Sequence, residues 1–391
     1  MKIESLCARE ISHSEINPPH LEAVYLSSSY KFNGLDEGIE IFDQRKAGDV
    51  YARYGHPNHR QIAHKLVDLE FGPESENGRA LVTNSGMSAI NTLITGLCTS
   101  GDKMICAHDL YGGSSDLFHL NISRAGIQVD EYDFSDLEGL EKKIEQTSPT
   151  ILYLESPSNP VLRVYDIKAL AEIAKKYDSY LIVDNTFNTS LIQKPIDLGA
   201  DFVIYSTTKY LNGHGNALGG AILSQHHDLM DDRLLKTMRL NGSTISPMDA
   251  WLLGQGIKTL PLRYKAQQHN AQLLADFLNE LSQVSKVYYP GLTMHANHDL
   301  AKEQMNGFGA MLSFELKENV DRFLRSLRLV TLAPTLGDIN SLVLHPATMS
   351  HRNMPEKQRL ELGITDQLIR LSVGIEHIDD LKSDILEALK A

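Results

Sequence analysis

The segment from about residue 60 to 245 alternates short apolar runs with stretches of helical periodicity, and this alternation restricts the possible folds strongly. The strand-like runs are Arg79–Thr83, Lys103–Ala107, Thr150–Glu155, Tyr180–Asp184 and Asp201–Tyr205. The helical stretches are Gln61–Phe71, Ser85–Ile94 and Ile167–Tyr177. Strands separated by helices require crossover connections, so we predict an α/β fold with a mainly parallel central sheet and helices on both faces. Ligands bind such sheets beyond the carboxyl ends of the strands.

Two other units flank this alternating region. Residues 1–58 are irregular and glycine-containing, and they are predicted to form an arm that packs on another subunit. Residues 59–246 are predicted to form the domain with the alternating pattern, and residues 247–391 are predicted to form a smaller α+β C-terminal domain. The elements predicted in this last domain are helices Met248–Gly256, Leu262–Leu281 and Ile378–Leu389 and strands Ala310–Leu316 and Ile369–Val373.

The net charge and the amino-terminal residues bear on which partners and which cellular location the sequence predicts. Fifty acidic and 37 basic residues give a formal net charge of −13, which argues against nucleic acid or an anionic membrane as a partner. No apolar run approaches the roughly 20 residues that cross a bilayer. Residues 1–5 lack the basic-then-apolar pattern of a signal peptide, so a cytoplasmic location is predicted.

Cysteine and histidine usage gives no sign of a disulfide framework or a metal site. Cys7, Cys98 and Cys106 contain no CxxC pair, which fits a reducing compartment. Several histidines occur without a convergent carboxylate or cysteine set, so no metal ligand is predicted. These histidines are His56, His59, His64 and His214.

The run Ser206–His214 directly follows the predicted strand Asp201–Tyr205 and contains Lys209. A desolvated lysine loses its preference for the charged form, and its amine then becomes a nucleophile. Neighbouring hydroxyl groups can donate hydrogen bonds to a phosphate. These are the groups that hold pyridoxal phosphate, which needs an amine for its aldehyde and an anchor for its phosphate. A lysine after a strand can also simply be solvated.

Four other strand ends carry candidate ligand-binding residues. Asn84–Ser88 is a small-residue turn into a helix, whose free N–H groups can bind phosphate, although Ser85 could equally be an ordinary N-cap. Asp184 could hold a pyridinium nitrogen protonated, or could be a turn aspartate. Tyr111 could stack on a flat ring or merely pack. Asn159 could bind a ligand or serve a turn before proline.

The motifs together resemble those of the trans-sulfuration (Cys/Met metabolism) pyridoxal-phosphate enzymes. This family includes cystathionine γ-synthase, cystathionine γ-lyase, methionine γ-lyase and the O-acylhomoserine sulfhydrylases. The resemblance covers essentially the whole chain and implies the pyridoxal-phosphate fold type I, which is aspartate-aminotransferase-like, with 59–246 as the cofactor-binding domain. The matching segments are Tyr51–Pro57, Asn84–Met87, Leu110–Gly113, Glu155–Pro160, Val183–Thr186, Ser206–His214 and Arg370–Glu376.

The resemblance implies a role for each cofactor-site residue. Lys209 would hold the cofactor covalently and then move protons between the α and β carbons of the substrate. Asp184 would pair with the pyridine nitrogen, and Tyr111 would stack on the ring and protonate the departing group. The residues implied to bind the phosphate are Gly86, Met87, Ser206 and Thr208.

Substrate binding and assembly are also implied. Arg370 would clamp the substrate α-carboxylate in a bidentate fork, assisted by Asn159 and Thr335. Asn159 would also contact the cofactor ring oxygen. Tyr51 and Arg53 would reach the phosphate of a neighbouring subunit, so that the sites are shared within a dimer and two dimers form a homotetramer.

Departures from the family pattern bear on the substrate. Members that hold a distal carboxylate often carry an arginine shortly after Tyr-Gly-Gly, where this chain has Asp116. Gly337–Leu342 lacks the family's glutamate. An uncharged tail therefore becomes more plausible, and we predict γ-elimination or γ-replacement on a sulfur-containing or homoserine-derived amino acid. O-acetylhomoserine sulfhydrylase, cystathionine or cysteine β-lyase and a non-catalytic pyridoxal-phosphate-binding homologue stay open as alternatives.

Overall fold

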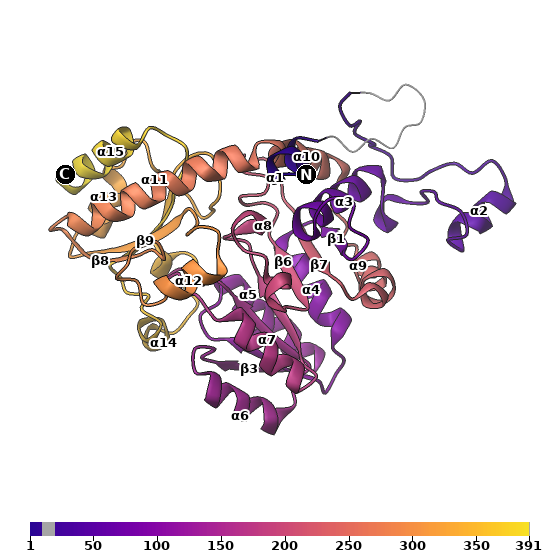
Figure 1. Cartoon of the computed structure of the whole chain (residues 1–391), viewed down its shortest axis with the longest axis horizontal. Helices are drawn as coiled ribbons and strands as arrows, with labels where there is room; N and C mark the ends of the chain where they lie inside the picture. Colours follow the sequence, from indigo (N-terminus) through magenta and orange to yellow (C-terminus); the bar gives the residue numbers. More distant parts are fainter. Residues whose placement is uncertain (10–19, 391) are drawn as a thin grey trace.

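The computed structural model describes residues 1–9 and 20–390, and Figure 1 shows its two sheets with helices around them. Residues 10–19, which belong to the predicted arm, and residue 391 lie outside the described residues. The arm contains α1 (Ile3–Ala8) and α2 (Leu35–Phe42). In Figure 1, α2 extends away from the rest of the chain.

The first sheet has seven strands and is mainly parallel, as predicted. Its order is β1 (Arg79–Thr83), β7 (Gly220–Ser224), β6 (Phe202–Tyr205), β5 (Tyr180–Asp184), β4 (Ile151–Glu155), β2 (Lys103–Ala107) and β3 (Gln128–Tyr132). Strands β6, β5, β4, β2 and β3 are parallel, whereas β7 is antiparallel to both of its neighbours. Since β1 and β6 are both antiparallel to β7, they run in the same direction as each other. The carboxyl ends of β1, β2, β4, β5 and β6 therefore meet at one edge.

The sequence did not predict β3 or β7. The edge strand β3 carries Gln128, Asp130 and Glu131 and lacks the apolar run of the central strands. Strand β7 is apolar and fully buried, but it follows β6 without an intervening helix, so the crossover pattern did not point to it. A strand entered through a loop is free to pair antiparallel with its neighbour.

Helices cover both faces of this sheet because successive side chains of a strand point to opposite sides. Leu81 packs in the cluster that contains Ile90 of α4, whereas the next residue, Val82, packs in the cluster that contains Leu66 of α3. Burying one such side chain contributes roughly 1.5–3 kcal/mol to folding. The helices that follow the arm, up to the second sheet, are α3 (Pro57–Phe71), α4 (Gly86–Leu97), α5 (Gly112–Asp116), α6 (Leu137–Thr147), α7 (Ile167–Lys176), α8 (Thr189–Ile192), α9 (Leu235–Asn241), α10 (Pro247–Lys258) and α11 (Leu260–Glu280).

The second sheet has five strands in the order β10 (Thr331–Leu332), β11 (Leu342–Leu344), β12 (Leu368–Ser372), β9 (Met311–Leu316) and β8 (Val284–Tyr288). The helices of this part are α12 (His298–Gln304), α13 (Val320–Ser326), α14 (Glu356–Glu361) and α15 (Ile378–Lys390). The long helix α11 connects the two parts and packs on the second sheet through residues such as Leu274 (Figure 1). The boundaries at 58/59 and 246/247 stay predictions, and α10 contributes Leu253 to the cluster around α3.

Candidate active site

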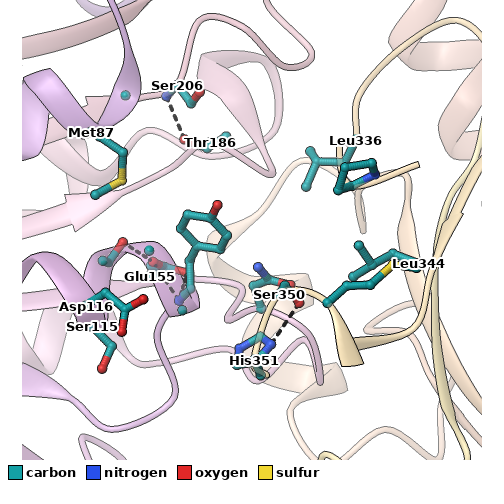
Figure 2. A pocket seen from close by; sticks show the side chains of 18 of the residues that line it. Met87, Ser115, Asp116, Glu155, Thr186, Ser206, Leu336, Leu344, Ser350 and His351 are labelled. Atoms are coloured by element: carbon teal, nitrogen blue, oxygen red, sulfur yellow. Dashed lines mark hydrogen bonds between the residues drawn. The ribbon is translucent and has the colours of Figure 1, made fainter. Parts of the chain in front are cut away.

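A cavity of about 1120 Å³ lies at the carboxyl edge of the first sheet, and segments of the C-terminal part close it from the other side. Figure 2 shows Met87 and Ser206 on one wall and Leu336 and Leu344 on the opposite wall. Most of the residues predicted from the sequence line this cavity. They are Gly86, Met87, Tyr111, Asn159, Asp184, Ser206, Thr208, Lys209, Thr335 and Arg370.

Lys209 lies just after β6, where the strand meets the cavity, and it is half-buried. Its Nζ donates a hydrogen bond of 2.9 Å to Oγ1 of Thr335, a residue of the C-terminal part. Burial, together with the positive charge of Arg370, lowers the pKa of Lys209 to about 8. About a tenth of the amine is therefore uncharged at pH 7, far more than for an ordinary lysine, and the uncharged amine is the nucleophilic form.

This lowered pKa leads to a testable pH dependence. In the cofactor-free protein, the rate at which an acylating reagent modifies Lys209 should rise with pH, reach half of its maximum near pH 8 and level off about one to two pH units higher, where nearly all of the amine is neutral. Exposed Lys176, whose pKa is raised by its hydrogen bond to Glu141, is the internal control and should become more reactive well beyond that point. Peptide mass spectrometry after short reactions measures both rates. Parallel pH profiles for the two lysines would contradict the assignment.

The start of α4 forms a cradle for an anion. Ser85 is the N-cap, as its alternative interpretation predicted, and its Oγ accepts the Ser88 N–H at 3.1 Å. Gly86 and Met87 are the first two helical residues, whose N–H groups have no partner within an α-helix. A Cβ placed on Gly86 would lie 2.9 Å from the Cβ of Ser206, so only glycine allows the two segments to approach this closely. The two interpretations of this turn are therefore compatible.

Two residues with hydroxyl groups beside the cradle, Ser206 and Thr208, already form hydrogen bonds within the chain. The Ser206 N–H donates to Oγ1 of Thr186 at 2.8 Å, which orients the turn after β6. Oγ1 of Thr208 donates to the Gly219 carbonyl oxygen at 3.2 Å and accepts the Gly219 N–H at 3.0 Å. Since a hydroxyl has one proton, Thr208 would have to exchange the first of these bonds to donate to a phosphate.

Asp184 lies at the carboxyl end of β5, next to Glu155 of β4 in the sheet register. Burial raises the pKa of Asp184 to about 6, and hydrogen bonds from Thr186 oppose this rise. Burial and the neighbouring Asp184 also raise the pKa of Glu155 well above its usual range. A buried carboxylate of this kind is stabilised by a cationic partner such as a pyridinium N–H.

Arg370 on β12 joins the two parts of the chain at the cavity. Its side chain is buried, with only 3% exposed, and burial lowers its pKa to about 10, so it stays cationic at neutral pH. Nη1 donates to Oδ1 of Asn159 at 3.0 Å, and Nη2 donates to the carbonyl oxygen of Thr335 at 3.1 Å. The guanidinium plane is thus held rigidly at the cavity wall, which suits recognition of a carboxylate by two parallel hydrogen bonds.

Tyr51 and Arg53 are not among the residues that line this cavity. The ring of Tyr51 is exposed (44%), and Nη1 of Arg53 donates to the Arg239 carbonyl oxygen at 2.8 Å. The Arg53 guanidinium also lies 4.7 Å from the centre of the Tyr54 ring. Within one chain, these two residues are therefore not brought together with Lys209.

Sequence reasoning missed several lining residues. Ser350, His351, Arg352 and Asn353 come from the loop between β11 and α14, and Glu155 was quoted in a motif without being given a role. The sequence signal for the loop was a short polar run, which is common on any protein surface. Among residues 1–9 and 20–390, no group of three or more His, Cys, Asp or Glu side chains could hold a metal ion.

The observed groups fit pyridoxal phosphate. The cavity combines a lysine of lowered pKa, an anion cradle of backbone N–H groups and a buried carboxylate at a neighbouring strand end. A fold of this kind with such a site defines a pyridoxal-phosphate-dependent enzyme. Residues 8–390 match the family described as Cys/Met metabolism PLP-dependent enzyme, and the chain belongs to this family.

Similar proteins cover the chain almost completely. The cystathionine β-lyase of Lactococcus lactis subsp. cremoris (strain MG1363) is 41% identical over 94% of this chain and 93% of its own length. The cystathionine γ-lyase of Bacillus subtilis (strain 168) is 42% identical over 90% and 92%. The solved metY protein of Campylobacter jejuni subsp. jejuni, which contains N'-pyridoxyl-lysine-5'-monophosphate, superposes with a TM-score of 0.94 at 30% identity and covers all of both chains.

The reaction class follows from this membership. Proteins of the family that match this chain are named as lyases, γ-synthases and sulfhydrylases. The chain is a pyridoxal-phosphate-dependent enzyme for elimination or replacement at the β or γ carbon of an amino acid, which covers both the predicted γ reaction and the β-lyase alternative. No helix among the described residues is long and apolar enough to cross a membrane.

Proposed function

We propose that this enzyme cleaves a carbon–sulfur bond of a thioether amino acid of the cystathionine type. The single observation that carries the proposal is that charged side chains from separate segments line one cavity. Arg370 lies near Lys209, and Asp116 and Arg352 belong to the wall formed by α5 and the loop before α14. A substrate with an amino-acid group at each end would find a partner for its distal ammonium and for its distal carboxylate.

Arg352 changes the substrate prediction made from the sequence. That prediction favoured an uncharged tail because Asp116 stands where related enzymes carry an arginine. Arg352 lines the same cavity from a different segment, and Nδ2 of its neighbour Asn353 donates to Oδ2 of Asp116 at 3.1 Å. The names of the curated relatives, cystathionine β-lyase and cystathionine γ-lyase, also support a cystathionine-type substrate.

The residues of the chain would divide the chemistry as follows. Pyridoxal phosphate, when bound, supplies an aldehyde for the substrate amino group and a ring that withdraws electrons from the α carbon. Arg370 would orient the substrate α-carboxylate, and the Lys209 amine would carry protons at the α and β carbons. Asp184 would keep the ring nitrogen protonated. Tyr111 would stack on the ring and supply a proton to the departing sulfur.

The phosphate site would be completed from a second subunit. Tyr51 and Arg53 lie on the arm and outside the cavity of their own chain, which supports their predicted contribution to a neighbouring site. Exposed apolar side chains on the arm helix α2, namely Leu35 and Phe42, also fit a buried position in an oligomer. The homotetramer and the cytoplasmic location stay predictions.

A substrate panel tests the proposed function. The holoenzyme should turn over cystathionine with a higher kcat/KM than methionine, cysteine or the O-acylhomoserines supplied with sulfide. Pyruvate as the 2-oxoacid product would identify β-elimination, and 2-oxobutyrate would identify γ-elimination. A higher kcat/KM on methionine or O-acetylhomoserine would instead favour the uncharged tail to which Asp116 points. Absence of any product would leave only the non-catalytic alternative and contradict the proposal.

A further inference from the structure

The turn Leu110–Gly113 presents Tyr111 to the cavity, and it is held from two sides. The Tyr111 side chain is itself 42% exposed, so packing alone fixes its position only loosely. The turn also begins the short helix α5, with the Ser114 N–H donating to the Tyr111 carbonyl oxygen at 2.9 Å. The position of the Tyr111 ring therefore depends on the contacts that hold the main chain of this turn.

Glu155 holds the turn from the first sheet. Its two carboxyl oxygens accept the Tyr111 N–H at 3.0 and 3.1 Å, and Oε1 also accepts the Ser114 hydroxyl at 3.2 Å (Figure 2). The side chain is buried, with 7% exposed, so these bonds are shielded from water.

His351 holds the turn from the C-terminal part. Its ring is 2% exposed, and Nε2 lies 3.3 Å from the Leu110 carbonyl oxygen. The main chain of the adjoining residue, Ser350, packs closely against the same turn, since a Cβ placed on Gly112 would lie 2.1 Å from the Ser350 carbonyl oxygen. Glycine at position 112 is therefore required for this contact. His351 and Leu110 are 241 positions apart in the sequence.

The hydrogen-bond network fixes which nitrogen of His351 carries the proton. A carbonyl oxygen can only accept, so Nε2 must donate to Leu110. Nδ1 then accepts the Ser350 hydroxyl at 2.9 Å, a bond drawn in Figure 2. Burial lowers the pKa of His351 to about 4, so the ring is neutral near pH 7 and has just this one N–H. Nε2 therefore joins the loop to the turn, whereas the bond at Nδ1 is made within the loop and orients the ring.

We propose that Glu155 and His351 are positioning residues that clamp the turn Leu110–Gly113 from opposite sides and thereby set the Tyr111 ring against the cofactor. The inference rests on the proposed stacking role of Tyr111. It adds that the position of this ring depends on contact between the two parts of the chain. Withdrawal of the 350–353 loop would release the ring.

A double-mutant cycle on cofactor binding tests the clamp without any activity measurement. Pyridoxal phosphate is titrated into cofactor-free protein, and the apparent Kd is read from visible absorbance and circular dichroism. Tyr111→Ala should weaken binding about tenfold, because one aromatic stacking contact is lost. His351→Ala and Glu155→Ala should each weaken it several-fold. In the Tyr111→Ala background the same two changes should have almost no further effect, since they act through the ring.

Conservative variants keep the test informative if an alanine variant fails to fold. His351→Gln retains an N–H that can reach Leu110, and Glu155→Gln retains an acceptor for the Tyr111 N–H, so both should recover most of the affinity. His298→Ala is the matched control, because Nδ1 of His298 also bonds a main-chain carbonyl oxygen, that of Pro290, but outside the cavity. It should lower the Tm and leave the Kd unchanged.

The outcomes separate the clamp from the proposed function. Loss of affinity that persists in full in the Tyr111→Ala background would overturn the clamp, and so would unchanged affinity in His351→Ala. An unchanged Kd for Tyr111→Ala would overturn both the stacking role and the clamp that depends on it. Wild-type protein that binds the cofactor but releases no product would count against the proposed function alone.

Discussion

Lys209→Ala is expected to abolish turnover, with kcat reduced by at least about 10³-fold. The reason is that, in the proposed mechanism, one amine would serve two purposes, covalent attachment of the cofactor and proton transfer at the α and β carbons. Its lowered pKa of about 8 and its 2.9 Å hydrogen bond to Thr335 place the amine ready for both. The measurement is 2-oxoacid release under saturating substrate, with cofactor content determined separately by absorbance.

Two variants make the Lys209 result specific. Lys209→Arg retains a positive charge but almost never loses its proton, so it should be as inactive as the alanine variant. Lys194→Ala is the matched control, since Nζ of Lys194 donates to the Glu70 carbonyl oxygen at 2.8 Å and does not line the cavity. It should lose stability and keep its turnover. Near-normal turnover by Lys209→Ala would remove the basis of the proposed mechanism.

Arg370→Ala should lower kcat/KM by about 10²- to 10³-fold, which corresponds to roughly 3–4 kcal/mol. The change would remove the proposed fork for the substrate α-carboxylate, and it leaves Oδ1 of Asn159 without this donor. Arg370→Lys should recover little, because a single ammonium group cannot make two parallel hydrogen bonds to a carboxylate. Steady-state kinetics with the best substrate of the panel measure both variants, and the loss should fall mainly on KM.

A buried arginine elsewhere controls for the loss of stability. Nη1 of Arg359 on α14 donates to the Ile364 carbonyl oxygen at 2.6 Å, its Nη2 lies 2.8 Å from Asp366, and it does not line the cavity. Arg359→Ala should therefore lower the Tm with little effect on kcat/KM. If Arg370→Ala changed only the Tm, in the same way as Arg359→Ala, then Arg370 would be structural and another group would bind the carboxylate.

Much of the first sheet could be predicted because its signals are local. β1, β2 and β5 have the predicted bounds, and β4 and β6 differ from them by one residue. Each of these strands is an apolar run, and each polar residue that follows it must lie at the same edge when the strands are parallel. This is why Gly86, Asp184 and Lys209 could be assigned to one site without coordinates. The antiparallel strand β7 could not be predicted in this way, because its direction depends on its pairing partners rather than on its own residues.

Residue type and the order of neighbouring elements were thus enough to predict the strand-end residues and the cofactor class. The tertiary structure alone decided which distant groups meet: Lys209 with Thr335, Arg370 with Asn159, and His351 with Leu110. These contacts join segments that are 126 to 241 residues apart, and they form only when the two parts of the chain pack together. Local periodicity carries no information about that packing, because the relative placement of two folded units is set by the shape and chemistry of surfaces assembled from many separate segments.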